Sequence, residues 1–167
     1  EMRAAAENSA TTIQGGITGR MQVVYTLRDM LAAMSAGRGG DRALADGLLV
    51  EMQANAQGLL GIWTGFEPNA FDGRDAQFAN TVNHDATGRY LPYATTDADG
   101  RINLEPIVGY DQPGDGDYYL KARDSGKPVI MEPFAYEVNG VSTLMTSLTA
   151  PILVGGNVVV VGGADVG

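Results

Sequence analysis

The sequence predicts an α+β domain in which a long N-terminal helix precedes an antiparallel sheet of about five to six strands flanked by helices. Two observations predict it. Apolar residues recur at helical spacing up to residue 57, and from residue 59 the pattern changes to short runs separated by turn residues. A chain of 167 residues is long enough for one domain with a real core. We expect a helical segment over residues 1–57 and a sheet-bearing module over residues 58–167.

The first expected helix covers residues 1 to about 36 and carries a heptad seam. Its a positions are Ala10, Ile17, Val24 and Leu31, and its d positions are Ile13, Arg20, Leu27 and Met34. Glycines at 15, 16 and 19 each weaken the helix by roughly 1 kcal/mol relative to alanine, so it needs packing support. The seam fits two partners, the domain's own core or the same helix of a second subunit.

The remaining elements follow from caps, turns and alternation. Residues 35–41 interrupt the first helix, and Asp41 is a suitable N-cap for a second helix from about 42 to 57 that Gly58 ends. We then expect a strand around 59–68, a short helix near 75–80, and two strands joined by a turn at 97–100. A loop at 110–117 and a short helix at 118–125 come next. Three strands with turns at Asn139-Gly140 and 155–157 complete the chain.

The composition argues against several classes of function. A net charge of −9 is unfavourable for binding to nucleic acids or anionic membranes, because a protein binds both through basic patches. The chain has no cysteine, which removes disulfides, thiol nucleophiles and cysteine-based metal sites. No apolar run is long enough to span a bilayer. Since the sequence starts inside a helical pattern and stops just after a strand, we expect a piece of a longer protein whose flanking membrane spans have been cut away.

No motif for catalysis or metal binding is found in the sequence. The segment Asp97-Ala98-Asp99-Gly100 fits a hairpin turn and not a calcium loop, because Thr95 and Pro106 occupy two required ligand positions. His84 is the only histidine and lies in a polar segment, so a serine or cysteine relay would depend on it alone. We expect no catalytic residue, no metal and no cofactor. A hydrolase with paired carboxylates is the remaining enzymatic alternative.

The most informative segment runs from Tyr110 to Gly140. It combines aromatic rings with carboxylates on a chain rich in glycine and proline, which is typical of a pocket for a small polar or cationic molecule. The rings are Tyr110, Tyr118, Tyr119, Phe134 and Tyr136, and the carboxylates are Asp111, Asp115 and Asp117. Trp63 and Tyr93 lie on expected strands, so each belongs either to the core or to this pocket.

A series of short motifs follows in order from about residue 59 to 166. It comprises Gly88-Arg89-Tyr90-Leu91-Pro92-Tyr93, Asp99-Gly100, Leu104 to Tyr110, Asp117-Tyr118-Tyr119, Gly126-Lys127 to Phe134, Leu144 to Ile152, and a closing segment that ends at Asp165. In order and spacing the set resembles the double Cache (dCache) ligand-binding domain of bacterial methyl-accepting chemotaxis proteins. Each motif alone is weak, whereas the ordered set is specific.

The resemblance implies a periplasmic or extracytoplasmic sensor between two membrane spans of an inner-membrane receptor. Residues 58–167 would form its membrane-distal, PAS-like Cache module, with the N-terminal helix along the subunit or at a homodimer contact. Its partner would be a small-molecule ligand, and its output would be chemotaxis. A histidine kinase or a cyclic-dinucleotide enzyme attached to the same module is the alternative output.

The resemblance also implies site residues. In family members that bind amino acids, an arginine holds the ligand carboxylate and a late aspartate holds the ammonium. Here Asp165 matches the aspartate, but Asp115 or Gly116 stands where the arginine would be. An amine or quaternary ammonium ligand is therefore expected. The alternatives are a purine, or an amino acid held by backbone groups or by an arginine such as Arg89 or Arg123. The expected binding residues are Trp63, Tyr93, Tyr110, Asp115, Tyr118, Tyr119, Phe134, Tyr136 and Asp165.

Overall fold

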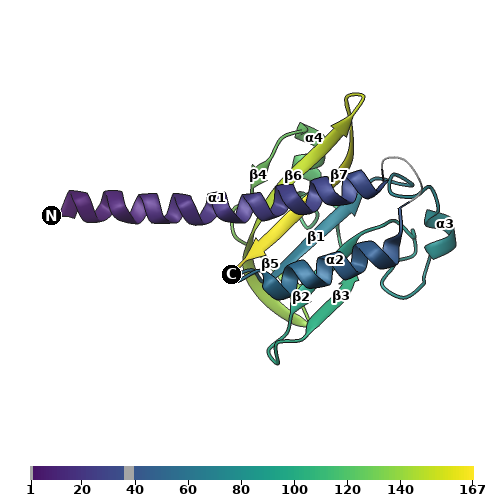
Figure 1. The fold of residues 1–167 in the computed structure, drawn as a ribbon, viewed down its shortest axis with the longest axis horizontal. Coiled ribbons are helices and arrows are strands. Elements are labelled where there is room, and N and C mark those ends of the chain that lie inside the picture. Colours follow the sequence, from purple (N-terminus) through teal and green to yellow (C-terminus); the bar gives the residue numbers. More distant parts are fainter. Residues whose placement is uncertain (1, 36–39) are drawn as a thin grey trace.

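The structure, a computed structural model, describes residues 2–35 and 40–167 and consists of one antiparallel sheet with four helices in these ranges (Figure 1). The helices are α1 (Met2–Ser35), α2 (Arg42–Asn55), α3 (Asp75–Phe78) and α4 (Asp117–Ser125). The strands are β1 (Gly61–Phe66), β2 (Pro92–Thr96), β3 (Ile102–Pro106), β4 (Val129–Ile130), β5 (Phe134–Val138), β6 (Val141–Val154) and β7 (Asn157–Val166). Their order is β3-β2-β1-β7-β6-β4, and β5 pairs with β6 off this path. The α+β class is confirmed.

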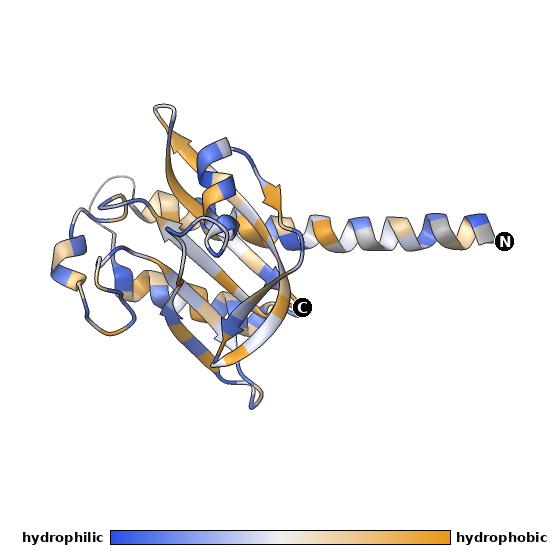
Figure 2. Ribbon diagram, turned by 180° about the vertical axis from the view of Figure 1, so that it is seen from behind, coloured by the Kyte–Doolittle hydropathy of each residue, from blue (hydrophilic) through white to orange (hydrophobic). Residues whose placement is uncertain are grey.

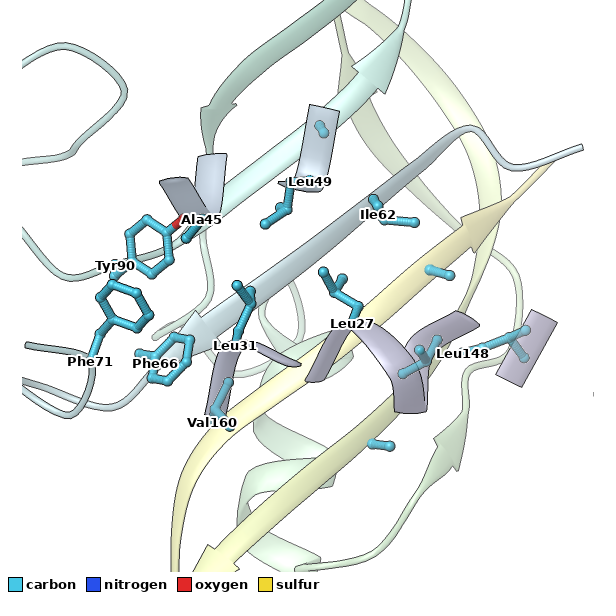
Figure 3. Close-up of a cluster of buried hydrophobic side chains, with 14 of the residues drawn as sticks. Leu27, Leu31, Ala45, Leu49, Ile62, Phe66, Phe71, Tyr90, Leu148 and Val160 are labelled. Carbon is cyan, nitrogen blue, oxygen red and sulfur yellow. The ribbon is translucent and has the colours of Figure 1, made fainter. Parts of the chain in front are cut away.

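The two faces of the sheet carry different layers. Helices α1 and α2 cover one face and enclose the larger core with β1, β6 and β7 (Figure 1). Figure 3 shows the side chains of this core pointing toward one another from the helices and from the strands, among them Leu27, Leu31, Ala45, Leu49, Ile62, Phe66, Leu148 and Val160. The other face carries α4, β5 and the connecting loops, which Figure 2 shows in front of the strands. An aromatic cluster fills the space between that layer and the sheet.

The heptad seam of α1 faces the domain's own sheet over its C-terminal half. Val24, Leu27 and Leu31 are at most 1% exposed and belong to the core shared with α2. The N-terminal half projects beyond the sheet (Figure 1), and the described side chains between residues 3 and 16 are exposed. From residue 17 onward the seam therefore packs within the subunit, which is the first of the two expected alternatives.

Helix α2 begins as the sequence predicts and ends slightly earlier. The Asp41 carboxylate accepts a hydrogen bond from the Leu44 backbone amide at 3.1 Å, so it is the N-cap. At the other end Ala56 already has an extended backbone conformation, and the helix stops at Asn55. The expected end at about residue 57 is therefore wrong by two residues. Gly58 instead turns the chain toward β1 with a φ of 73°.

The sheet has seven strands, one more than the upper limit of the expectation. The additional strand is β4, in which Val129 and Ile130 pair with Thr149 and Leu148 of β6. Two residues are too few to show alternation in a sequence. The hairpin turns lie where they were expected, with positive φ at Gly100, Asn139 and Gly140, Gly155 and Gly156. The interruption expected at 35–41 falls mostly on residues outside the described part of the chain.

A buried arginine fixes the long connection between β1 and β2 against α2. Arg42 pairs with Asp72 and Asp75 at 2.8 Å each, and it donates to the Gly88 carbonyl at 2.7 Å. Its guanidinium carbon also lies 4.0 Å from the Phe78 ring centroid. Buried arginine with several partners holds a loop in one geometry. The connection therefore presents residues 88–93, which lead into β2, in a fixed position.

We expect Leu27→Ala to destabilise the protein by about 2–5 kcal/mol, because it leaves a cavity between α1 and the sheet. Leu44→Ala is the matched control, since Leu44 on α2 is 58% exposed, and it should change stability by no more than about 0.5 kcal/mol. Urea unfolding of both variants checks this. Equal effects would mean that the seam does not face the subunit's own sheet.

Candidate functional site

A small inner cavity lies between the sheet and the layer formed by α4 and β5. It is lined by Trp63, Tyr93, Ile107, Tyr118, Phe134, Tyr136, Met145, Ser147 and Asp165. In this structure the space is too narrow to admit a water molecule. Six of the nine residues expected from the sequence line it: Trp63, Tyr93, Tyr118, Phe134, Tyr136 and Asp165.

Strand alternation and register bring these side chains together. Along β1, Ile62 and Phe66 point into the core under the helices, whereas Trp63 points to the opposite face. Asp165 of β7 is paired with Ser147 of β6 on one side. On its other side it pairs with β1, which places Trp63 beside it. Three neighbouring strands thus deliver one carboxylate and two hydrogen-bond donors to a single point.

A glycine on β7 leaves room for the tryptophan. Trp63 is the register partner of Gly163, and a Cβ atom at Gly163 would lie 2.1 Å from the indole ring. No side chain can be tolerated at that distance, so the indole lies directly on the strand backbone. This close approach brings the indole nitrogen to Asp165, two residues further along β7.

Asp165 is a buried carboxylate without a cationic partner in the described part of the chain. It is 3% exposed, and its Oδ1 accepts hydrogen bonds from the Ser147 hydroxyl and from the Trp63 indole N–H, the latter at 3.4 Å. No lysine or arginine lines the cavity. Desolvation raises the pKa of Asp165 to about 6, although interactions with the side chains of Ser147, Tyr93 and Trp63 act in the opposite direction. Near neutral pH the cavity therefore contains an anion that the described residues leave unneutralised.

Five aromatic residues form a cage around this carboxylate, which we call the ring cage: Trp63, Tyr93, Tyr118, Phe134 and Tyr136. The Trp63 and Tyr118 rings make an edge-to-face contact at 5.2 Å, and the Tyr118 and Tyr136 rings make another at 5.6 Å. Phe134 stacks parallel to Tyr118 at 6.2 Å. A cation in such a cage would be attracted by the faces of the aromatic rings and by the negative charge of the carboxylate.

Hydrogen bonds to one loop residue hold two of the cage tyrosines. The Tyr118 hydroxyl donates to the Val108 carbonyl at 2.6 Å, and the Val108 amide donates to the Tyr136 hydroxyl at 3.0 Å. The hydroxyl of Tyr93 differs, because it is buried and its partner is the Asp165 carboxylate, although the geometry falls short of a full hydrogen bond. Burial first, and then the nearby charge of Asp165, raise the pKa of Tyr93 and keep it protonated.

Two other expected residues, Tyr110 and Tyr119, lie behind the cage and do not line the cavity. The Tyr119 hydroxyl donates to the Glu67 carboxylate and accepts from Arg89 at 2.9 Å. The Tyr110 hydroxyl donates to Asp85 at 2.6 Å. The Tyr110 and Tyr119 rings meet edge to face at 6.2 Å. They support the wall of the cavity from outside, so a direct role in binding has no geometric basis in this structure.

Asp115 lies on an outer cleft beside the cavity. The cleft is lined by Val108, Gly109, Gly114, Asp115, Phe134, Ala135, Tyr136 and Glu137. Phe134 and Tyr136 are half-buried and line both the cleft and the cavity. A ligand that enters from the cleft must therefore pass these two rings of β5.

The two arginines considered as carboxylate clamps are engaged elsewhere. Arg89 is buried and donates to the Phe66 carbonyl from both Nε and an Nη atom, at 3.1 and 2.8 Å. Arg123 pairs with its neighbour Asp124 at 2.8 Å. Neither lines the inner cavity or the outer cleft. The described part of the site thus contains no group suited to holding a ligand carboxylate bidentately.

Three residues that line the cavity were missed from the sequence: Ile107, Met145 and Ser147. Met145 and Ser147 are two apart on β6 and so share a face, which a strand pattern indicates. That this face is the one toward Asp165 depends on the pairing of β6 with β7. Such a long-range register is not contained in the local pattern of either strand.

A second, apolar groove lies between α1 and the edge of β6. Its lining includes Ile17, Arg20, Leu144, Leu148 and Val166, with Arg20 as its only charged side chain. It contains no carboxylate and is separate from the ring cage, so it does not suit a cation.

In the ranges 2–35 and 40–167, no cluster of three or more metal-ligating side chains is found. Likewise, no described helix is both long and apolar enough to cross a membrane.

The fold is that of a PAS-like domain: an antiparallel sheet with a long helix on one face and an aromatic-lined cavity on the other. A model of the family described as methyl-accepting chemotaxis protein-like, first PDC sensor domain, matches residues 47–167. The chain therefore belongs to this family of sensor domains. The family resemblance drawn from the sequence is confirmed.

Known proteins with similar sequences or structures agree with this assignment. The chain is 28% identical over 119 residues to methyl-accepting chemotaxis protein TlpQ of Pseudomonas aeruginosa, covering 65% of this chain and 17% of that protein. The solved extracellular domain designated histidine kinase mmHK1S-Z2 is 32% identical with a TM-score of 0.82, over 95% of this chain and 56% of that one. The solved methyl-accepting chemotaxis protein X is 28% identical with a TM-score of 0.72, over 98% and 61%. The chain thus spans only part of each relative.

We expect Asp165→Asn to stabilise the ligand-free protein by up to about 3 kcal/mol at pH 8, from the raised pKa of Asp165. The folded-state pKa lies above the unfolded value, so ionisation of Asp165 lowers stability as pH rises through about 6. The gain should therefore shrink below pH 6 and vanish near pH 3. Chemical unfolding at several pH values measures it.

Asp85→Asn is the control of opposite sign. Burial raises the pKa of Asp85, but hydrogen bonds from Thr87 and Tyr110 outweigh it and leave the pKa below its usual value. A lowered pKa contributes stability above the unfolded value, and the substitution removes it. Asp85→Asn should therefore destabilise the protein at pH 8. A loss of stability in Asp165→Asn of the same size would contradict the account of a strained carboxylate.

Proposed function

We propose that this domain senses a small cationic molecule, an amine or a quaternary ammonium compound, on behalf of a transmembrane chemoreceptor. The observation that carries the proposal is the Asp165 carboxylate, buried in the ring cage with no lysine or arginine lining the cavity. Buried charges in proteins are ordinarily paired, since an unpaired one is costly. A cationic ligand supplies the missing charge.

The surroundings of the carboxylate favour a cation over other ligands. Its cavity is walled by five aromatic side chains, whose faces attract positive charge when water is excluded. The outer cleft beside it carries Asp115 and Glu137 and no basic residue, so the approach is also acidic. The net charge of −9 also attracts cations to the domain at long range.

An α-amino acid is less well matched to the site. Its carboxylate would need a cation or several donors, yet Arg89 and Arg123 are engaged with other groups. It would also lie close to the buried Asp165 and be repelled by it. A purine remains the second alternative, because stacked rings and a carboxylate that accepts N–H bonds would also suit a neutral heteroaromatic molecule.

The parent protein follows from the relatives as a proposal. We infer an extracytoplasmic position for this domain in an inner-membrane receptor, with residues 58–167 as its membrane-distal Cache module. A histidine kinase is the second candidate output, favoured by the 32% identity to the extracellular domain of mmHK1S-Z2. A homodimer contact through α1 would use its exposed part before residue 17, because the seam beyond packs on the subunit's own sheet. The coding sequence beyond Gly167 distinguishes the two outputs.

We expect at least one cationic amine in a panel of amines, quaternary ammonium compounds, amino acids and purines to raise the melting temperature. A ligand whose concentration is one hundred times its dissociation constant stabilises the folded protein by about 2.7 kcal/mol. Trp63 is the only tryptophan and lies in the cage, so its fluorescence reports whether the ligand enters there. Affinity should fall about tenfold per pH unit below pH 6, as Asp165 becomes protonated.

Asp165→Asn should abolish this binding, and Asp85→Asn should retain it. Both substitutions remove one carboxylate, but only Asp165 lines the cavity. Binding of amino acids or purines alone, or amine binding that survives Asp165→Asn unchanged, would contradict the proposed function.

A further inference from the structure

We propose that a latch closes the inner cavity and that a ligand enters from the outer cleft only when this latch opens. The latch consists of the Val108 backbone and the hydroxyls of Tyr118 and Tyr136, and it lies between the cleft and the cavity. It regulates access to the site described above, and it rests on the proposed function only for the class of molecule that enters.

In this structure the cavity is closed to solvent. It is too narrow to admit a water molecule, and Trp63, which lines it, is 1% exposed. Any organic ligand is larger than water, so it cannot reach the cavity unless one of the walls moves. Phe134 and Tyr136 line both the cavity and the outer cleft, so these rings are the wall that separates the two spaces.

One loop residue joins the ring of Tyr136 to the rest of the wall. The Val108 amide donates to the Tyr136 hydroxyl at 3.0 Å, and the Val108 carbonyl accepts from the Tyr118 hydroxyl at 2.6 Å. The hydroxyls of Tyr118 and Tyr136 also interact with each other. Strand β5, helix α4 and the segment that follows β3 are thus tied together at one point. The Tyr136 ring also makes edge-to-face contacts with Tyr93 and Tyr118, which are individually weak.

The strand that carries Tyr136 lies outside the main sheet. β5 pairs with residues 141–145 of β6, whereas β7 pairs with β6 from Thr146 onward. β5 and the start of β6 therefore form a two-stranded extension, and a hairpin of two strands is marginally stable by itself. Its turn is held by Asn139, which accepts a hydrogen bond from the Asn103 side chain at 3.1 Å. The middle of β5 is held to the neighbouring loop by the latch.

A latch of this kind makes ligand entry depend on an opening equilibrium. Because the closed form admits no ligand, the observed association rate is the rate for the open form multiplied by its population. One hydrogen bond changes such an equilibrium by about threefold to tenfold. Loss of the Tyr136 hydroxyl should increase the open population by about this factor. Since the latch also closes over a bound ligand, association and dissociation should both become faster.

Trp63 provides a test that needs no ligand. It is the only tryptophan of the chain, and both acrylamide quenching of its fluorescence and solvent exchange of its indole N–H require entry into the cavity. In Tyr136→Phe we expect the quenching rate constant and the exchange rate to rise by about threefold to tenfold. Phe134→Ala removes the other ring between the cleft and the cavity, and it should raise both rates further.

Tyr90→Phe is the matched control. The Tyr90 hydroxyl also donates a hydrogen bond from a buried ring, to Asp46 at 2.8 Å, but it belongs to the core under α1 and α2. This variant loses a hydrogen bond of the same kind without touching the latch, so both Trp63 rates should stay at their wild-type values. Melting curves of the three variants establish that the rates are measured on folded protein.

Propylammonium connects the latch to binding. Its association and dissociation are followed at pH 8 by stopped-flow fluorescence of Trp63, and a cation of the panel that does bind replaces it if it does not. In Tyr136→Phe we expect both rate constants to exceed those of the wild type by about threefold to tenfold. The dissociation constant should change less than either rate constant, because the latch is closed in both the free and the bound protein.

The outcomes separate the latch from the proposed function. The latch is overturned if the Trp63 rates are unchanged in both Tyr136→Phe and Phe134→Ala, or if they rise equally in Tyr90→Phe. It is also overturned if quenching becomes faster but the cation associates no faster, because the ligand then enters elsewhere. In each of these cases a cation that binds leaves the proposed function standing. If the Trp63 rates rise as expected and no cation binds, the latch stands and the proposed function fails.

Discussion

The buried carboxylate of Asp165 is the constraint on which the rest of the site depends. Removing a charge from water costs several kcal/mol unless partners replace the lost hydration. Here the side chains of Ser147, Tyr93 and Trp63 replace it only in part, and the raised pKa of Asp165 is the consequence. The aromatic layer above the sheet excludes water and so maintains this imbalance. A site built in this way is less stable alone and gains most from a ligand of positive charge.

Strand β7 connects this site to the long helix through two adjacent glycines. Gly163 meets the Trp63 indole on the cavity side, whereas a Cβ atom at Gly162 would lie 3.1 Å from the Cβ of Arg28 on α1. The cage and the helix are therefore separated by the backbone of one strand (Figure 1). A ligand that moves Trp63 acts on the strand that supports α1. It can shift the arrangement of the helix only by the difference between its affinities for the two arrangements.

Much of this structure follows from local sequence patterns. The features that could not be predicted from the sequence depend on contacts between distant parts of the chain. The Asp41 cap, the turn at Asn139-Gly140 and the alternation around Trp63 are local and were predictable. Adjacent helix residues point in different directions, so only one of Tyr118 and Tyr119 could reach the cavity; packing against β1 decides which. The place of Ser147 depends on the register of β6 with β7. A heptad seam has the same appearance whether it packs on its own sheet or on a second helix.

The carboxyl carbon of Asp165 reports directly whether this carboxylate is charged and whether a cation binds beside it. Its ¹³C chemical shift, followed by NMR as the pH is varied with and without propylammonium, reports the charge of this one group. We expect an apparent pKa near 6 in the free protein, because the carboxylate is buried and no described lysine or arginine lines its cavity. This pKa should fall markedly when the amine is bound, since a neighbouring cation favours the ionised form. If the pKa of Asp165 is near 4 in the free protein, or if the amine leaves it unchanged, Asp165 is not a buried carboxylate that a cationic ligand neutralises.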